Sequence, residues 1–378
     1  MKILFVTPYF PSYPYDNYGE VVLLLAKQIA KDKKIKSIEV LTPVFISRYE
    51  KRYYELKVYS PEETLSRTGR IIWLLGRFKK LMQKNKYDVI NLQWVFPTGL
   101  VLFFLPKGIR SKIVVTARGS DIYLRYRNPF FKELLREILK KCHAAVSISS
   151  DLDKKIKALS NEKIKRFIIP SIGIDFSQFK NVDKKELSRL QKKLKSGSKK
   201  VILFIGGITR IKGADFLIKA INVLKNRYHF KDFLCVMIGP LEGELTGQLQ
   251  EWISEYRLKE QVQFTGKLKY EELKYYYRSA DVFVLPSRTE GLGAVLLEAL
   301  YFKVPIIASA TGGITDLIQD KKNGFLVPVG DHNRIASVLN DFFNGQLKLQ
   351  NKNIVDIKKY NYKFMADKTI DVYEKIEP

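Results

Sequence analysis

Short apolar runs rich in β-branched residues recur along the chain and alternate with longer amphipathic stretches. The runs predict strands that are buried on both faces, and the stretches predict helices with one apolar stripe. The predicted strands cover residues 2–7, 38–42, 89–92, 113–116, 144–149, 201–205, 234–238 and 282–285. The predicted helices cover residues 19–26, 67–86, 128–141, 214–224, 294–300 and 361–376. This alternation predicts an α/β fold with doubly wound parallel sheets.

A polar, lysine-rich segment at residues 181–200 interrupts the alternation and contains Ser196-Gly197-Ser198, the best linker signal in the chain. We therefore predict two domains, at residues 1–180 and 199–345. A chain of 378 residues is long enough for each domain to have its own core.

The most informative stretch, residues 282–300, reads VFVLPSRTEGLGAVLLEAL. A predicted strand there turns through Gly291 and Gly293 and enters a predicted helix. Backbone amides and the helix dipole converge on an anion at such a junction, just outside the carboxyl ends of parallel strands. Glu290 and Glu298 flank the turn, and carboxylates accept hydrogen bonds from sugar hydroxyls. The combination suits a sugar nucleotide, although spacing alone equally allows a solvated loop residue and a helix-surface residue.

Three other predicted strands are also followed by glycine or arginine residues that suit an anion. Gly19 follows the first predicted strand and opens a helix, and GGITRIKG follows the predicted strand at residues 201–205. The strand at residues 113–116 leads into Arg118 and, three residues later, Asp121. An arginine offers paired donors to a phosphate or carboxylate but cannot act as a base at neutral pH. A simple salt bridge between Arg118 and Asp121 is the open alternative.

Residues 286–299 resemble the P-S-x-x-E-G-x-G-x-x-x-x-E-A motif of the group 1 glycosyltransferases, also called glycosyltransferase family 4. The matching residues are Pro286, Ser287, Glu290, Gly291, Gly293, Glu298 and Ala299. Gly312-Gly313 and the segment from Asn323 to Val327 continue the resemblance. It implies the GT-B fold, in which two Rossmann-like domains face a cleft. It also implies that a C-terminal helix, at about residues 361–378, crosses back to the first domain.

The resemblance further implies a nucleotide-diphosphate sugar donor, held mainly by the second domain. Glu290 would accept hydrogen bonds from the donor sugar, and Glu298 from the ribose. Lys212 and the backbone amides near Leu292 and Gly293 would bind the diphosphate. Members of the family retain the anomeric configuration. We expect no cofactor and no metal, because a protein cation neutralises the leaving diphosphate.

The chain departs from the family pattern at three places. Gly207 occupies the position of an arginine that binds the diphosphate, and Arg210 on the same loop is the candidate replacement. Gly19 is the second residue of a usual glycine pair whose loop approaches the donor or acceptor. Arg118 replaces the histidine of an H-G-x-D motif, so we expect Arg118 and Asp121 on the acceptor side. The catalytic candidates are Glu290, Lys212 and Arg118.

Charge is distributed unevenly along the chain. The 66 Lys and Arg exceed the 39 Asp and Glu by 27, and residues 1–180 contain 34 of the former and 16 of the latter. A solvated lysine-rich surface, a nucleic-acid face and a face for anionic lipid are open explanations. The basic stretch at residues 67–86 fits a helix packed on the sheet or a helix on lipid. An acidic acceptor, lipid-linked or a polysaccharide of the cell envelope, would suit this charge.

Other features narrow the class of protein. Cys142 and Cys235 are too few for a disulfide framework, and the three histidines lack partners at metal-ligand spacing. The longest apolar stretch, around residues 100–105, is far shorter than the ~20 residues of a spanning helix. We expect a cytoplasmic protein, soluble or peripheral on the inner face of the membrane. The alternative functions are a nucleic-acid- or membrane-surface-binding protein, a glycosidase or phosphorylase, and a non-catalytic relative of the family.

Overall fold

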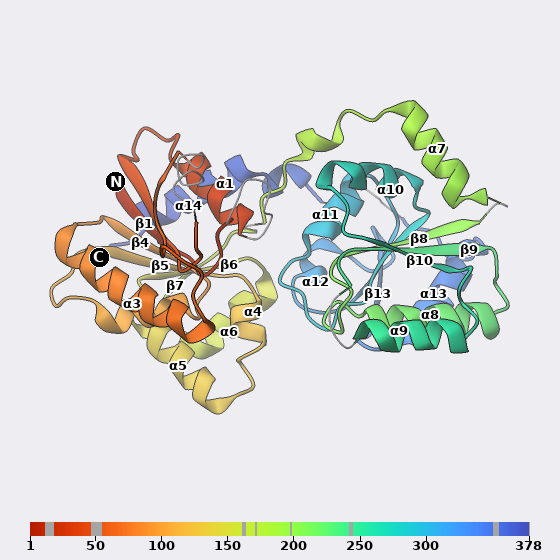
Figure 1. Ribbon diagram of the computed structural model, residues 1–378, viewed down its shortest axis with the longest axis horizontal. Coiled ribbons are helices and arrows are strands. Elements are labelled where there is room, and N and C mark those ends of the chain that lie inside the picture. Colours follow the sequence, from red (N-terminus) through yellow and green to blue (C-terminus); the bar gives the residue numbers. More distant parts are fainter. Residues whose placement is uncertain are drawn as a thin grey trace. The chain divides into compact units, whose positions relative to one another are not determined.

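Two parallel β-sheets form the centres of two units of the chain (Figure 1). In this computed structural model the first unit contains residues 1–174 and 358–378, and the second contains residues 175–357. The described residues are 1–11, 19–46, 55–160, 164–170, 172–196, 199–241, 245–350 and 355–377. These limits differ from the predicted ranges 1–180 and 199–345, because the second unit begins at residue 175 and extends to residue 357.

The sheet of the first unit has seven strands in the order β3-β2-β1-β4-β5-β6-β7, and neighbouring strands run parallel. The strands are β1 (Lys2–Val6), β2 (Ser37–Leu41), β3 (Lys57–Tyr59), β4 (Val89–Gln93), β5 (Lys112–Ala117), β6 (Ala144–Ser147) and β7 (Lys165–Ile168). The helices are α1 (Glu20–Ile29), α3 (Arg67–Lys84), η1 (Thr98–Phe104), α4 (Ser120–Tyr123), α5 (Pro129–Lys140), α6 (Ser150–Ser160) and α14 (Tyr362–Lys375). Strands β3 and β7 were not predicted, because β3 has three residues and β7 is not buried.

The C-terminal helix α14 completes the core of the first unit. Asn361 caps its start, because the Asn361 side chain accepts a hydrogen bond of 2.8 Å from the Phe364 N–H. Met365, Ile370 and Tyr373 form its buried stripe and share one apolar cluster with residues of α1, β1 and β2. The expectation that the terminal helix returns to the first domain is confirmed.

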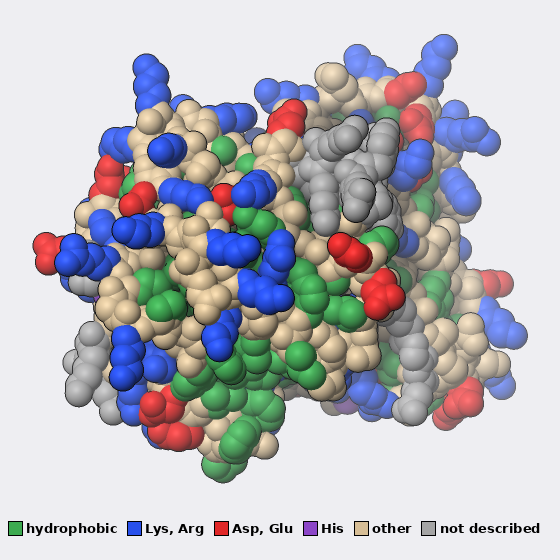
Figure 2. Space-filling view, turned by 60° about the vertical axis from the view of Figure 1, so that its left-hand side comes forward, with side chains coloured by type: hydrophobic (Ala, Val, Ile, Leu, Met, Phe, Trp, Pro, Cys, Tyr) green, Lys and Arg blue, Asp and Glu red, His purple; other side chains and the backbone are tan. Residues whose placement is uncertain are grey.

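The basic helix α3 packs against its own unit. Ser66 caps its start by accepting a hydrogen bond from the Gly69 N–H. Its buried residues are Leu74, Phe78, Leu81 and Met82. This burial supports the packed reading of the stretch at 67–86 over the lipid reading. Lys and Arg side chains are spread widely over the visible face of the molecule (Figure 2). Among the described residues, no helix combines the length and apolar character that crossing a bilayer requires.

The sheet of the second unit has six parallel strands in the order β10-β9-β8-β11-β12-β13. The strands are β8 (Lys200–Ile205), β9 (Phe233–Ile238), β10 (Val262–Gly266), β11 (Val282–Leu285), β12 (Ile306–Ser309) and β13 (Phe325–Val327). The helices are η2 (Phe176–Phe179), α7 (Lys184–Leu194), α8 (Ala214–Asn226), α9 (Leu245–Glu255), η4 (Tyr270–Glu272), α10 (Leu273–Ser279), α11 (Ala294–Tyr301), α12 (Ile314–Leu317) and α13 (His332–Phe343), and η5 (Ile357–Tyr360) lies where the chain returns to the first unit.

Helix α7 corrects the linker prediction for residues 181–200. Asp183 caps the helix, and the Gln191 side chain donates a hydrogen bond of 3.3 Å to the Arg278 carbonyl of α10. The segment therefore packs on the second unit as a surface helix. Of the predicted linker signal Ser196-Gly197-Ser198, Gly197 and Ser198 lie outside the described residues.

Both sheets reverse their strand order once. The reversal lies between β1 and β4 in the first unit and between β8 and β11 in the second. Ligands of doubly wound sheets bind at such a point, outside the carboxyl ends of the strands. Apart from Gly19, the predicted donor residues follow β8 and β11, so the fold of the second unit brings their loops together at its reversal.

The contact between these two loops requires glycine at position 213. Gly213 has a φ of +74°, and a Cβ there would overlap the carbonyl oxygen of Pro286. The Gly213→Ala variant must therefore strain its backbone and push the two loops apart. We expect it to lose roughly 3 kcal/mol or more of stability, measured by thermal unfolding.

Gly247→Ala in α9 is the matched control, because a Cβ at Gly247 meets nothing within 4 Å. We expect this variant to be neutral or more stable by up to about 1 kcal/mol. Equal melting temperatures of the two variants would contradict the proposed role of the Gly213 contact.

Candidate functional site

The loops after β8 and β11 are joined by their backbones. The Arg288 N–H donates a hydrogen bond of 2.8 Å to the Ile211 carbonyl, next to the close approach of Gly213 to Pro286. The two loops therefore form one surface at the carboxyl ends of the two strands.

Lys212 and Glu290 meet on this surface. The Lys212 Nζ lies 2.6 Å from the Glu290 Oε2, and the side chains are 32% and 11% exposed. The structure thus brings together the two residues predicted to bind the diphosphate and the sugar. A cation and an acceptor in direct contact can bind a phosphate and a hydroxyl of one ligand.

The diglycine turn after β12 fixes the position of Glu290. The Gly313 N–H donates a hydrogen bond of 3.1 Å to the Glu290 carbonyl. Gly312 has a φ of +53°, and a Cβ there would overlap the same carbonyl oxygen. A side chain at position 312 would displace the loop that carries the carboxylate.

Helix α11 begins beside Glu290. Gly293 caps its start with a φ of +91° and has no side chain to bond the first amides of the helix. Leu292 is 2% exposed and anchors the turn in the core. The first N–H groups of α11 therefore remain suited to an anion, as the sequence predicts for Leu292 and Gly293.

Glu298 lies inside α11 and is 3% exposed. It accepts hydrogen bonds from the hydroxyls of Tyr270, at 2.9 Å, and Tyr277, at 2.7 Å. Burial raises the pKa of Glu298 to about 7, although the two tyrosine hydroxyls oppose this change. The sequence did not reveal these partners, since they lie 28 and 21 residues away along the chain.

Arg210 and Arg288 share a different partner. The Arg288 guanidinium donates two hydrogen bonds of 2.7 Å to the carboxylate of Asp215, which is 3% exposed. The Arg210 Nη1 lies 3.7 Å from the same carboxylate, and the Arg210 Nη2 donates to Gln248 at 2.6 Å. Sequence reasoning missed Arg288, although it stands two positions before Glu290 in the matched motif.

Position 207, where this chain has glycine in place of the family's arginine, has room for a side chain. A Cβ at Gly207 would meet only Thr209, at an ordinary distance of 3.6 Å. The backbone therefore does not require glycine there, unlike at Gly213.

In the first unit, Gly19 begins α1 with a φ of +83°. A Cβ at Gly19 would overlap the backbone of Tyr9 and Phe10, so Gly19 lies directly against the chain that follows β1. Much of that loop, residues 12–18, lies outside the described residues.

Arg118 follows β5 and is held by a chain of buried polar side chains. Its Nε donates to the Gln93 Oε1 at 3.0 Å, and the Gln93 Nε2 donates to the Asn91 Oδ1 at 2.7 Å. Asn91 in turn donates to the Tyr373 hydroxyl of α14. The guanidinium also lies 5.1 Å from the ring centre of Trp94. Burial lowers the pKa of Arg118 to about 10, so it stays protonated at neutral pH.

Asp121 is 1% exposed and joins two loops. Its carboxylate accepts backbone hydrogen bonds from Val95 at 2.6 Å, Gly119 at 2.8 Å and Arg118 at 3.2 Å. Burial raises its pKa in spite of these bonds. Asp121 therefore positions Arg118 through the backbone, and a role in contact with an acceptor receives no support from this burial.

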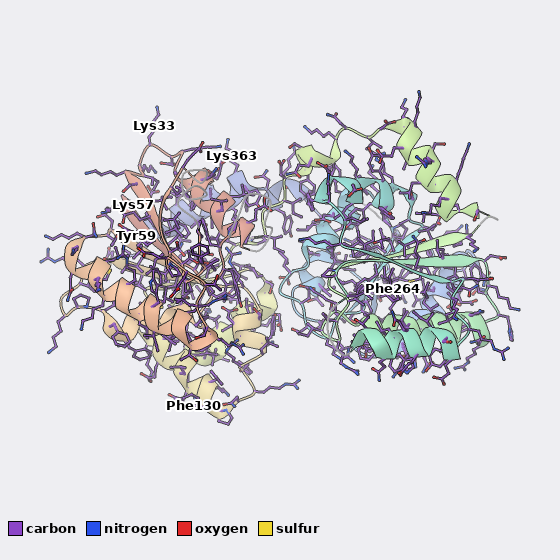
Figure 3. All side chains as sticks on the ribbon, in the orientation of Figure 1. Lys33, Lys57, Tyr59, Phe130, Phe264 and Lys363 are labelled. Atoms are coloured by element: carbon purple, nitrogen blue, oxygen red, sulfur yellow. The ribbon has the colours of Figure 1, made fainter. Side chains whose placement is uncertain are left out.

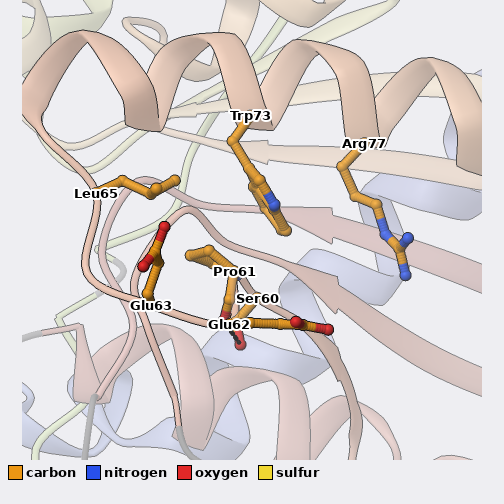
Figure 4. Close-up of a pocket in the computed structure, with 7 residues that line it drawn as sticks. All are labelled: Ser60, Pro61, Glu62, Glu63, Leu65, Trp73 and Arg77. Atoms are coloured by element: carbon orange, nitrogen blue, oxygen red, sulfur yellow. Dashed lines mark hydrogen bonds between the residues drawn. The ribbon is translucent and has the colours of Figure 1, made fainter.

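A pocket lies apart from the residues described so far. It follows β3, whose Lys57 and Tyr59 are labelled in Figure 3. The pocket has a volume of about 590 Å³, and Trp73 projects into it above Pro61 (Figure 4). Its other lining residues are Ser60, Glu62, Glu63, Leu65 and Arg77. It contains none of the predicted site residues.

Among the described residues, no three His, Cys, Asp or Glu side chains are placed so that they could hold a metal ion. His143 has a structural role, since its Nδ1 accepts a hydrogen bond of 2.9 Å from the Ile113 N–H.

Among curated proteins, an uncharacterized glycosyltransferase of Methanocaldococcus jannaschii is 24% identical, and the match covers 100% of this chain and 99% of that protein. The putative teichuronic acid biosynthesis glycosyltransferase TuaC of Bacillus subtilis is 26% identical over 87% of this chain and 86% of its own. A GDP-mannose-dependent phosphatidylinositol monomannoside mannosyltransferase of Mycolicibacterium smegmatis is 25% identical over 77% and 81%.

Among solved structures, Anabaena HepE in complex with UDP and glucose superimposes with a TM-score of 0.75 at 16% identity, covering 99% of both chains. This likeness shows the fold, which is GT-B with two Rossmann-like domains. The family model of glycosyl transferases group 1 matches residues 186–363, and that of Glycosyltransferase Family 4 matches residues 20–171. With most of its length matched by these two models, the chain belongs to the group 1 glycosyltransferases, family 4, and is a transferase.

Proposed function

We propose that the protein moves a sugar from a nucleotide-diphosphate sugar to an acidic acceptor, with retention of the anomeric configuration. The observation that carries this proposal is the contact of Lys212 with Glu290 beside the start of α11, at the strand reversal of the second sheet. A diphosphate at the helix start and a sugar beside the carboxylate would engage both groups at once. HepE binds UDP and glucose on the same fold, which supports a donor of this class.

The donor contacts follow from the charges at the site. Lys212 would bind the diphosphate together with the amides of Leu292 and Gly293, and Glu290 would orient the sugar hydroxyls. Negative charge grows on the diphosphate as the glycosidic bond breaks, so a fixed cation there binds the transition state more tightly than the ground state. The lysine supplies the charge that a metal ion supplies in other transferases, and we propose catalysis without a metal or cofactor.

Glu298 would accept hydrogen bonds from the ribose. Each carboxylate oxygen has two acceptor positions, and the tyrosine hydroxyls occupy one on each. The remaining acceptor position on each oxygen is the one that a ribose hydroxyl would use.

Retention fits the chemistry at the end of β5. Arg118 remains protonated at neutral pH and cannot take the proton of the acceptor hydroxyl. We propose that a leaving phosphate oxygen takes this proton on the face from which it departs. Arg118 would then stabilise negative charge on the donor or the acceptor.

The acceptor is proposed to be lipid-linked or a polysaccharide of the cell envelope, and acidic. Residues 1–180 have 34 Lys and Arg against 16 Asp and Glu, which favours a negatively charged partner. The names of two relatives, one of teichuronic acid biosynthesis and one acting on phosphatidylinositol monomannoside, point in the same direction. We propose that the protein works on the cytoplasmic face of the membrane.

Donor binding is tested by thermal shift with UDP-, GDP- and ADP-sugars, because a bound ligand raises apparent stability by mass action. One nucleotide class should raise the melting temperature. Glu290→Gln and Lys212→Ala should then lower the turnover of that donor by about 10²- to 10³-fold. Glu251→Gln and Lys259→Ala, at exposed positions of the same unit, are the matched controls. Unchanged turnover in both site variants, or no shift with any donor, would refute the proposed function.

The pKa of Glu298 predicts a pH-dependent stability. A carboxyl with a pKa of about 7 in the folded state and an ordinary one when unfolded stabilises the protein most at low pH. This stabilisation is lost as the pH rises through about 7. Glu298→Gln cannot ionise, so its stability relative to the parent should rise by on the order of 2 kcal/mol between pH 5.5 and 8.5. Melting temperatures at both values measure this; a constant difference would contradict the raised pKa.

The space at Gly207 allows the family's arginine to be restored. Gly207→Arg should fold with little change in melting temperature, since a Cβ there meets only Thr209. The added guanidinium should strengthen binding of the donor nucleotide diphosphate by roughly threefold to tenfold. Calorimetric titration measures the affinity, with Gly207→Ala as the control for backbone effects. Weaker binding by the arginine variant alone would place position 207 away from the diphosphate.

A further inference from the structure

Hydrophobic side chains are exposed together on one part of the first unit. Nine large hydrophobic residues are exposed in the described part of the chain, and four of them lie between residues 103 and 130. Phe103 and Phe104 end η1, Leu124 follows α4, and Phe130 is the second residue of α5. Phe130 is 72% exposed and Leu124 is 60% exposed. Such a concentration of apolar surface marks a site of interaction.

The elements that carry these residues lie against one another. The ring centre of Phe131 is 5.5 Å from that of Phe96 and 5.6 Å from that of Phe130. Farther along α5, Gly99 of η1 lies against Ile138. Phe130 is at the lower end of the first unit in Figure 3, and Figure 2 shows hydrophobic side chains gathered in the lower part of the view. We call this surface the aromatic face; it consists of Phe96, Phe103, Phe104, Leu124, Phe130 and Phe131.

Cations border the aromatic face. The Arg125 guanidinium lies 4.5 Å from the ring centre of Phe96, and the Lys141 ammonium lies 5.3 Å from that of Phe103. Residues 103–141 contain ten Lys and Arg and only three Asp and Glu. Two ion pairs are present there, Arg136–Glu133 and Lys140–Glu137. The face therefore combines apolar rings with an excess of positive charge.

We propose that the aromatic face binds the surface of a membrane that contains anionic lipids. Phe and Leu side chains of a peripheral protein bury at the boundary between the headgroups and the acyl chains, and Lys and Arg beside them bind lipid phosphates. A second copy of the chain is a poor occupant, because two faces of the same positive charge repel each other. The proposal rests on the proposed function in one respect, that the acceptor is presented at a membrane.

The aromatic face is continuous with the loops that hold Arg118. The Asp121 carboxylate binds the N–H groups of Val95 and Arg118, and Phe96 directly follows Val95. Trp94, beside the Arg118 guanidinium, belongs to the same loop. A membrane against the aromatic face would thus hold the headgroup of an acceptor lipid near Arg118.

Vesicle sedimentation of the full chain tests this surface. The probes are vesicles of phosphatidylcholine alone and of phosphatidylcholine with phosphatidylglycerol, each at low and high salt. We expect binding only to the anionic vesicles, weakened by salt. Leu124→Ser with Phe130→Ser should weaken it by about tenfold or more. Arg125→Gln with Lys141→Gln, which removes the two cations beside the rings, should weaken it by roughly 10- to 30-fold.

Matched controls separate this face from general effects of charge and apolar exposure. Val329→Ser removes a side chain that is 45% exposed in the second unit. Lys33→Gln with Lys363→Gln removes two cations at the upper end of the first unit, opposite Phe130 (Figure 3). Both controls should bind as the parent does.

Equal binding to both kinds of vesicle, no binding, or unchanged binding by the face variants would overturn the proposal. Self-association that the face variants abolish would also overturn it, in favour of a second copy. The thermal shift with nucleotide sugars is measured on the same samples. If nucleotide sugars raise the melting temperature but the protein does not bind vesicles, only the membrane face is refuted. If the protein binds vesicles but no nucleotide sugar raises the melting temperature, only the proposed donor function is refuted.

Discussion

The approach of two backbones at Gly213 and Pro286 is the constraint on which the proposed donor site depends. The strands β8 and β11 are neighbours in the sheet, but the residues they deliver are far apart in sequence, since Lys212 and Glu290 are 78 positions apart. Only a residue without a side chain lets the two loops come close enough for an ion pair of 2.6 Å. The glycine of the diglycine turn, Gly312, acts in the same way on the other side of Glu290. Backbone contacts thus set the distance between the charges.

The sequence predicts some parts of this structure better than others. Buried parallel strands are continuous apolar runs, so most of them were predicted, while the three-residue β3 carries too short a signal. Residues 184–194 were interpreted as linker because Leu194 is the only buried residue of α7, and a helix with so little burial resembles a solvated segment. Lys212 and Glu290 were identified through a motif. The tyrosines of Glu298 and the Asp215 partner of Arg288 depend on tertiary geometry, which no local pattern encodes.

The charged residues of the candidate sites have different kinds of partner. In the second unit, Lys212 is paired with Glu290 and Arg288 with Asp215, whereas Glu298 accepts from two tyrosine hydroxyls. In the first unit, Arg118 is held by neutral amides, through Gln93 and Asn91, and the chain ends at the Tyr373 hydroxyl. Neutral partners fix the orientation of a guanidinium without cancelling its charge. Through Tyr373, the C-terminal helix therefore contributes to the positioning of Arg118 as well as to the core of the first unit.

The partners of Arg118 matter because this arginine replaces the histidine that the family motif has at position 118. A histidine there could exchange a proton near neutral pH, whereas an arginine with a pKa of about 10 keeps its charge. A transferase with a permanent cation at this place must take the acceptor proton elsewhere, and in the proposed mechanism the leaving phosphate is that base. The substitution is then compatible with catalysis if the acceptor carries negative charge that the arginine binds. The excess of Lys and Arg in residues 1–180 would favour such an acceptor, and under the proposed function Arg118 would bind its negative charge.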